Sequence, residues 1–252
     1  MPRFTSARLM ATFLVCGLPA AVARGQQPQP SAQVAATAAD DAANKDLVRL
    51  SEKGEIWLDL KRKAVVVDGQ VCLREGTLEM FACPKGTKEH ESVVSLNCKA
   101  EEVHAGLLRV GAIAGTPVRF DPEYKAATGT VIDIYVLWKD TEGKARQVRA
   151  QEWVKNSKTG KALEYDWVFA GSGFWKDEET GQQRYQAESG DLICVSNFPS
   201  ATLDLPIESS QANDNLLFTA FTANVPAKTT KVRIVLIPRQ KADEKKPAAP
   251  KP

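Results

Sequence analysis

The chain has few of the residues on which most metal centres and many active sites depend. Its 252 residues include only two histidines, His90 and His104. It has five cysteines, and no two of them are separated by just two residues. That short spacing is typical of zinc ribbons and of thiol–disulfide oxidoreductases. We therefore expect neither a standard structural zinc site nor a thioredoxin-like redox motif.

The chain also lacks an excess of either charge. Lysine and arginine total 33 against 31 acidic residues, which gives a net charge of +2. Capture of nucleic acid needs a concentrated basic face, so the sequence indicates no nucleic-acid partner. The local excess of lysine lies in residues 239–252, which contain no aromatic side chain that could stack on a base. We expect this segment to be a disordered tail rich in lysine, proline and alanine.

Only one apolar run is prominent, and it is too short to span a bilayer. Residues 9–18 follow Arg3 and Arg8 and precede the small residues at 21–23. This order is typical of a signal peptide, which we assign to residues 1–25, with an uncleaved anchor as the alternative. We therefore expect export to the periplasm or cell envelope, and no transmembrane segment in the mature chain. Residues 26–50 are rich in alanine, glutamine and proline and predict a flexible spacer.

Export would leave four cysteines in an oxidising compartment: Cys72, Cys83, Cys98 and Cys194. An even number permits two disulfides with three connectivities. We favour a bridge between Cys72 and Cys98, because both lie in predicted strands of the same region.

The folded unit is predicted to span residues 51–238. Alternating apolar residues and β-branched runs predict a succession of short strands, and the pair Asp68–Gly69 is a turn signal between two of them. An apolar stripe with helical spacing predicts one helix over residues 101–111. The sequence therefore favours an α+β fold, a mostly antiparallel sheet with one or two short helices. The predicted strands are residues 56–60, 64–67, 70–74, 78–83, 93–98, 131–138, 145–150, 166–170, 191–195 and 231–237.

A dense polar segment at residues 83–91 (CPKGTKEHE) is the main candidate site. Loops held between strands often present functional side chains, and histidine is the commonest metal ligand. We therefore expect any binding site to use Lys88, Glu89, His90, Glu91 and His104. A divalent metal would take His90, His104 and Cys83 as ligands.

The same residues have other interpretations. Lys85 and Lys88 would repel a metal and suit a small anionic ligand. Lys88 and its neighbouring glutamates could instead form an ion-paired loop that ties two strands together. Farther along the chain, Asp204 could complete a polar site with the histidines. Residues 167–175 predict a tight strand exit beside aromatic core residues, with an aromatic-lined pocket as the alternative.

Four stretches together resemble the YdjY domain, a family of exported bacterial proteins of unknown function. They are residues 76–91, 103–108, 167–172 and 195–206, and the resemblance extends over roughly residues 54–238. The resemblance implies a fold and an envelope location, and it assigns no activity and no catalytic residue. We interpret the chain as an exported binding or scaffold module whose partner is an envelope protein or a small anionic ligand. The alternative is a metal-dependent or thiol enzyme that uses Cys83, Glu89, His90 and His104.

The export hypothesis predicts that the mature protein begins after about Ala23 to Gly25, because signal peptidase cleaves after small residues. Intact-mass analysis of the protein from its native host measures this directly. A mass that retains residues 1–23 would contradict the prediction.

Overall fold

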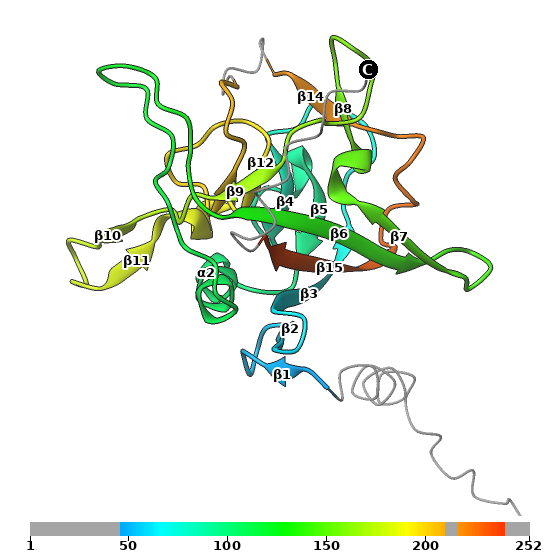
Figure 1. Cartoon of the computed structure of the whole chain (residues 1–252), viewed down its shortest axis with the longest axis horizontal. Helices are drawn as coiled ribbons and strands as arrows, with labels where there is room; N and C mark the ends of the chain where they lie inside the picture. Colours follow the sequence, from blue (N-terminus) through cyan, green and yellow to red (C-terminus); the bar gives the residue numbers. More distant parts are fainter. Residues whose placement is uncertain (1–45, 210–215, 240–252) are drawn as a thin grey trace, which may run out of the picture. The chain divides into compact units, whose positions relative to one another are not determined.

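Figure 1 shows a computed structural model of the chain, which describes residues 46–209 and 216–239. The predicted signal peptide, residues 26–45 of the predicted spacer and residues 240–252 of the predicted tail lie outside these residues. Within the described part, no helix is long and apolar enough to cross a membrane.

Short strands dominate the described chain, joined by loops and single helical turns. The strands are β1 (Val48–Arg49), β2 (Ile56–Asp59), β3 (Ala64–Val71), β4 (Met80–Pro84), β5 (Ser92–Leu96), β6 (Val131–Lys139), β7 (Ala145–Arg149), β8 (Val154–Asn156), β9 (Trp167–Phe169), β10 (Phe174–Lys176), β11 (Gln183–Tyr185), β12 (Ile193–Cys194), β13 (Leu203–Asp204), β14 (Phe218–Ala220) and β15 (Lys231–Pro238). The helices are α2 (Ala100–Arg109) and the 3₁₀ turns η1 (Glu89–Glu91), η2 (Ala150–Trp153) and η3 (Gln186–Ser189).

Eight of these strands form a closed ring of hydrogen-bonded neighbours. The order around the ring is β3, β15, β6, β9, β13, β12, β4 and β5, and β5 then pairs with β3. Of the eight pairs of adjacent strands in the ring, β12–β13 and β4–β5 are parallel. The other six pairs are antiparallel. β2 extends the sheet outward from β3, and β1 and β7 add further strands outside the ring.

The predicted α+β class was therefore wrong. The structure is mostly β, an eight-stranded closed barrel with a single α-helix in its described part, and helices make up only 11% of it. The expected helix at residues 101–111 is present as α2, together with most of the expected strands. Ring closure joins strands that are distant in the sequence, so the local patterns that predict single strands contain no information about it.

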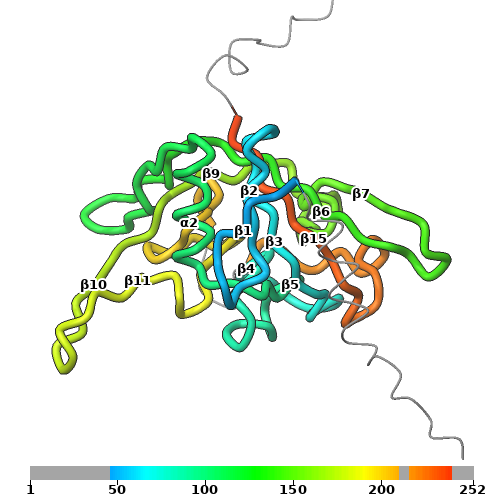
Figure 2. Tube along the Cα trace, turned by 90° about the horizontal axis from the view of Figure 1, so that it is seen from below, coloured from blue at the N-terminus to red at the C-terminus, as the bar shows by residue number. Residues whose placement is uncertain are grey.

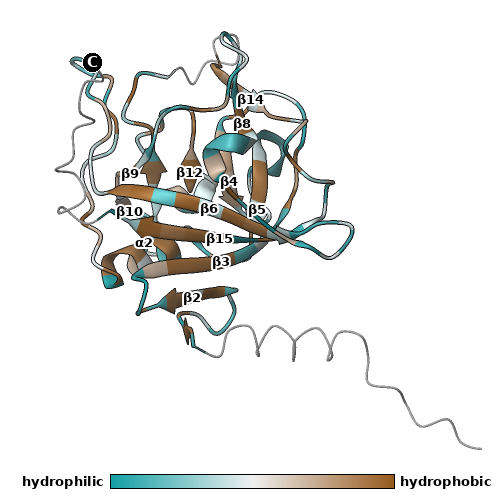
Figure 3. Ribbon diagram, turned by 45° about the vertical axis from the view of Figure 1, so that its right-hand side comes forward, coloured by the Kyte–Doolittle hydropathy of each residue, from teal (hydrophilic) through white to brown (hydrophobic). Residues whose placement is uncertain are grey.

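The barrel core follows from the period-two burial pattern of its longest strands, whose ribbons are largely hydrophobic in Figure 3. In β6 and β15 buried residues alternate with partly exposed ones, and Ile134 lies opposite Leu236 across the pair. The largest buried side chains add to this core, and the rings of Phe81 and Trp167 lie 5.7 Å apart. This burial of apolar surface is the main stabilising contribution to such a fold.

The turn expected at Asp68–Gly69 does not form, because β3 continues straight through both residues. The Asp68 carboxylate accepts two hydrogen bonds, of 2.6 and 2.7 Å, from the guanidinium of Arg233 on β15. Gly69 pairs with Val232 on one side and Leu96 on the other. A Cβ atom at Gly69 would lie 2.2 Å from the carbonyl oxygen of Ser95. The glycine is therefore needed for close strand approach and not for a turn.

α2 lies beside β2 and β3, and the β10–β11 hairpin projects away from the barrel (Figure 2). The helix buries Val103, Gly106 and Leu107. A Cβ atom at Gly106 would lie 3.1 Å from Val65 of β3, so the glycine lets the helix axis come close to the sheet. The backbone N–H of Glu101 donates to the carboxylate of Glu188, which ties the first turn of α2 to η3.

Candidate functional site

The predicted site loop connects the parallel strands β4 and β5 and ends in η1. Gly86 adopts a φ of 85°, a conformation that glycine reaches easily. Its backbone N–H donates to the Glu89 carboxylate, and the Thr87 hydroxyl donates to the carbonyl of Pro84. Glu89 therefore holds the loop closed.

Lys88 is the centre of this loop. Its Nζ lies 3.1 Å from Asp191 Oδ1, 3.4 Å from Glu79 Oε2 and 3.5 Å from Glu91 Oε1. The same ammonium lies 4.5 Å from the centre of the Phe198 ring, and Gly190 leaves room for its alkyl stem. Burial acts to lower the pKa of Lys88, but the three carboxylates outweigh it and the pKa is raised. Lys88 therefore remains a cation that links η1 to the residue before β4 and to the segment before β12. Of the two glutamates in the ion-paired alternative, Glu91 pairs with Lys88, whereas Glu89 accepts from Gly86.

The structure does not bring the two histidines together. The His90 side chain is 76% exposed, and its Nε2 lies 3.8 Å from the Glu91 carboxylate. His104 is half-buried on α2, where its Nδ1 lies 2.9 Å from the Tyr185 hydroxyl and its ring packs edge-on against Phe169. Burial lowers the pKa of His104, so the ring is neutral near pH 7. Each histidine therefore has its own local partner.

The proposed metal ligands Cys83, His90 and His104 do not form one cluster. No group of three or more histidine, cysteine, aspartate or glutamate side chains within residues 46–209 and 216–239 could hold a metal ion. Asp204, which could have completed a site with the histidines, instead contacts Asn197.

The four described cysteines are free thiols, so the predicted Cys72–Cys98 bridge is not formed. Cys72 donates from Sγ to the Ser92 carbonyl at 3.0 Å, and burial together with nearby Cys83 and Glu89 raises its pKa to about 12. Burial also raises the pKa of Cys83, Cys98 and Cys194. Because the thiolate is the reactive form, these protonated thiols are poor nucleophiles.

Sequence reasoning missed a concentration of buried polar groups in residues 191–209. Six of the nine buried polar residues of the described chain lie there. Asn197 donates from Nδ2 to Asp204 Oδ1 and to the Leu205 carbonyl, and its Oδ1 accepts from the Ser209 N–H and from the Tyr124 hydroxyl. These polar residues are scattered among apolar ones without a regular period, and the sequence does not show which way they face.

Asp204 is the most perturbed carboxyl of this network. Burial raises its pKa to about 7, although hydrogen bonds from Asn197 and the Leu205 N–H to Oδ1 act in the opposite direction. Its second oxygen, Oδ2, is buried without a hydrogen-bond partner among the described residues. A group of this kind titrates near neutral pH and makes stability depend on pH.

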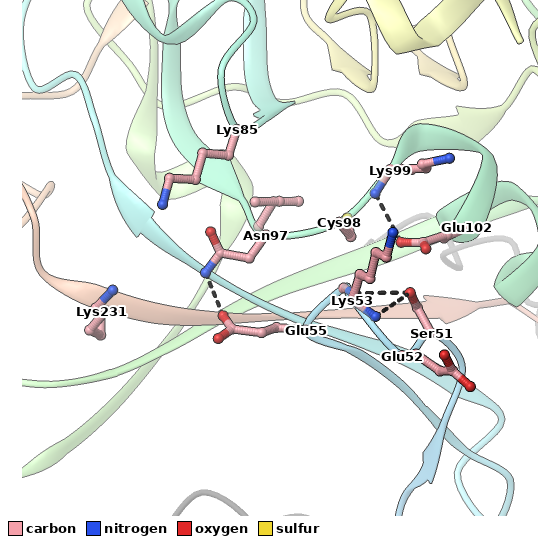
Figure 4. Close-up of a pocket in the computed structure, with 12 residues that line it drawn as sticks. Ser51, Glu52, Lys53, Glu55, Lys85, Asn97, Cys98, Lys99, Glu102 and Lys231 are labelled. Atoms are coloured by element: carbon pink, nitrogen blue, oxygen red, sulfur yellow. Dashed lines mark hydrogen bonds between the residues drawn. The ribbon is translucent and has the colours of Figure 1, made fainter. Parts of the chain in front are cut away.

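A surface groove of about 860 Å³ lies between the turn before β2, the end of β5 and the start of α2 (Figure 4). Its walls are joined through the backbone: Glu55 N–H donates to the Asn97 carbonyl at 2.7 Å, and Lys85 N–H donates to the Leu96 carbonyl at 2.9 Å. Gly54 contributes to the hollow, since a Cβ atom there would lie 2.6 Å from Glu102 Oε2. Four lysines line the groove: Lys53, Lys85, Lys99 and Lys231.

Comparison with known proteins bears directly on the family of this barrel. The family model described as the YdjY domain matches residues 56–237, well over half of the chain. The chain belongs to the YdjY domain family. No curated protein and no solved structure matches it. The matched residues include the whole barrel ring except the last residue of β15, so the YdjY domain here contains the barrel.

Replacement of Lys88 by methionine should destabilise the YdjY domain by about 2 kcal/mol, because three partly buried carboxylates would be left without their cation. Chemical denaturation followed by tryptophan fluorescence gives the free energy of unfolding. Lys125→Met is the matched control, since it breaks an exposed pair with Glu123 and should cost at most about 0.5 kcal/mol. Equal losses in both variants would contradict a central role for Lys88.

Asp204→Asn should change how stability depends on pH. The folded-state pKa lies above the ordinary aspartate value, so the folded protein holds a proton that the unfolded chain releases. The stability from this group is present at low pH and is lost as the pH rises towards about 7. Between about pH 5 and pH 8 the variant should therefore gain about 3 kcal/mol relative to wild type. A difference between the two proteins that does not vary with pH would refute this assignment.

Proposed function

We propose that the chain is an exported, non-catalytic binding or scaffold domain of the YdjY family, located in the periplasm or cell envelope. The observation that carries the proposal is the dispersal of the reactive side chains. His90 is exposed beside Glu91, His104 is bound to Tyr185, and Cys83 is buried with a raised pKa. Catalysis by acid–base or nucleophilic groups requires such side chains to lie within hydrogen-bond reach of one another.

The alternative, an enzyme built on Cys83, Glu89, His90 and His104, has less support from the geometry. Glu89 is used in closing its own loop by accepting from Gly86. His104 contacts residues of β9 and β11, and its hydroxyl partner Tyr185 in turn lies 3.0 Å from Thr202 Oγ1. The side chains of the loop thus support the fold, while the groove beside β5 offers a hollow surface for a ligand.

The export part of the proposal rests on the sequence of residues 1–25, with its arginines, short apolar run and small residues. The spacer that follows would give the barrel reach within the envelope. A binding domain on such a spacer needs no reactive group of its own.

Zinc titration tests the proposal against its alternative. We expect equal and negligible uptake by the mature wild-type protein, by His90→Ala and by His104→Ala, because the two rings have separate partners. Isothermal titration calorimetry measures the uptake. Stoichiometric binding by wild type that is lost in both variants would overturn the proposed function in favour of a metal site.

A further inference from the structure

The groove of Figure 4 has a charge arrangement that points to a class of ligand. Of its four lysines, Lys99 is paired with Glu101 at 3.0 Å. The ammonium groups of Lys53, Lys85 and Lys231 have no hydrogen-bond or ion-pair partner among the residues that the structure describes. These three lysines come from the turn before β2, the loop after β4 and the start of β15.

The acidic residues of the groove compensate these charges only in part. Glu102 Oε2 accepts from the Lys99 N–H at 3.0 Å and caps α2. The Glu55 carboxylate accepts from the Asn97 side chain. Glu52, the third acid, lies at the opposite end of the groove from Lys85 and Lys231 (Figure 4). The Glu55 carboxylate lies on the same side as Lys85 and Lys231, so two ammonium groups face one carboxylate there and leave that end with an excess of positive charge (Figure 4).

The groove is also built before any ligand arrives. Asp68 N–H donates to the Glu55 carbonyl at 2.9 Å, and Asn97 N–H donates to the Asp68 carbonyl at 3.0 Å. Ser51 Oγ accepts from the Gly54 N–H at 2.9 Å and fixes the turn on the far wall. A site held by backbone hydrogen bonds loses little conformational entropy when a ligand binds, which favours affinity.

We propose that this groove binds a small molecule that carries two or more phosphate or carboxylate groups. The proposal rests on the proposed binding function and names the ligand class for it. Ammonium groups from separate segments can each meet a different anionic group of one ligand, as lysines do with phosphates. The groove volume of about 860 Å³ lies within the range of small-molecule sites. The Asn97 amide and the Ser51 hydroxyl line the groove and can orient polar parts of the ligand.

Calorimetric titration of the mature protein with pyrophosphate and with citrate tests this inference and separates phosphate from carboxylate ligands. The double variant Lys85→Gln/Lys231→Gln should bind the preferred probe at least about tenfold more weakly, because each charge-assisted contact contributes on the order of a tenfold factor. Lys158→Gln/Lys228→Gln removes the same charge from exposed lysines outside the groove and should bind like wild type. Matching unfolding midpoints establish that all three proteins are folded.

Binding should also weaken as sodium chloride is raised to about 0.15 M, since screening acts on exposed charges. Equal affinity in both double variants, or no binding of either probe by wild type, would overturn the anion site. Neither result touches the proposed non-catalytic role, which fails if wild type binds zinc and both histidine variants lose that binding.

Discussion

The closure of the ring at Gly69 is the contact on which the rest of the structure depends. β3 must pair with β15 on one edge and with β5 on the other, and the Ser95 carbonyl leaves no room for a side chain at this position. Closure pairs β3 with β5, the two edge strands of an otherwise open eight-stranded sheet, and so removes edges that would expose unpaired backbone groups. The neighbouring residue, Asp68, is hydrogen-bonded through its backbone to both Glu55 and Asn97. The groove therefore lies at the point where the barrel closes.

Local patterns predicted individual elements well and their assembly poorly. The alternation in β6 and β15 and the apolar stripe of α2 are properties of a few adjacent residues, and they are visible in the sequence. At Asp68–Gly69 the local signal favours a turn, yet a partner 165 residues away, Arg233, holds the segment extended. Tertiary contacts of this kind override local preference, and ring closure could not be read from the sequence without them.

The site shows the same division between local and distant information. Lys88, Glu89 and Glu91 do interact within their loop or beside it, as close spacing suggests. Asp191 and Phe198, which complete the surroundings of Lys88, come from about a hundred residues farther along the chain. The scarcity of histidine drew attention to His90 and His104, but scarcity says nothing about whether two side chains meet. The groove lysines are unremarkable in sequence because they belong to three separate segments.

The position of β15 in the ring has a consequence for how the chain reaches its folded state. β15 is the last of the ring strands in sequence order, yet it lies between β3, the first, and β6. Until residues 231–238 are available, both neighbours keep an open edge and the apolar faces of β3 and β6 lack a shared partner. A chain that emerges gradually from a ribosome thus lacks one ring strand until its end is reached. The ring can close only after this final strand has emerged.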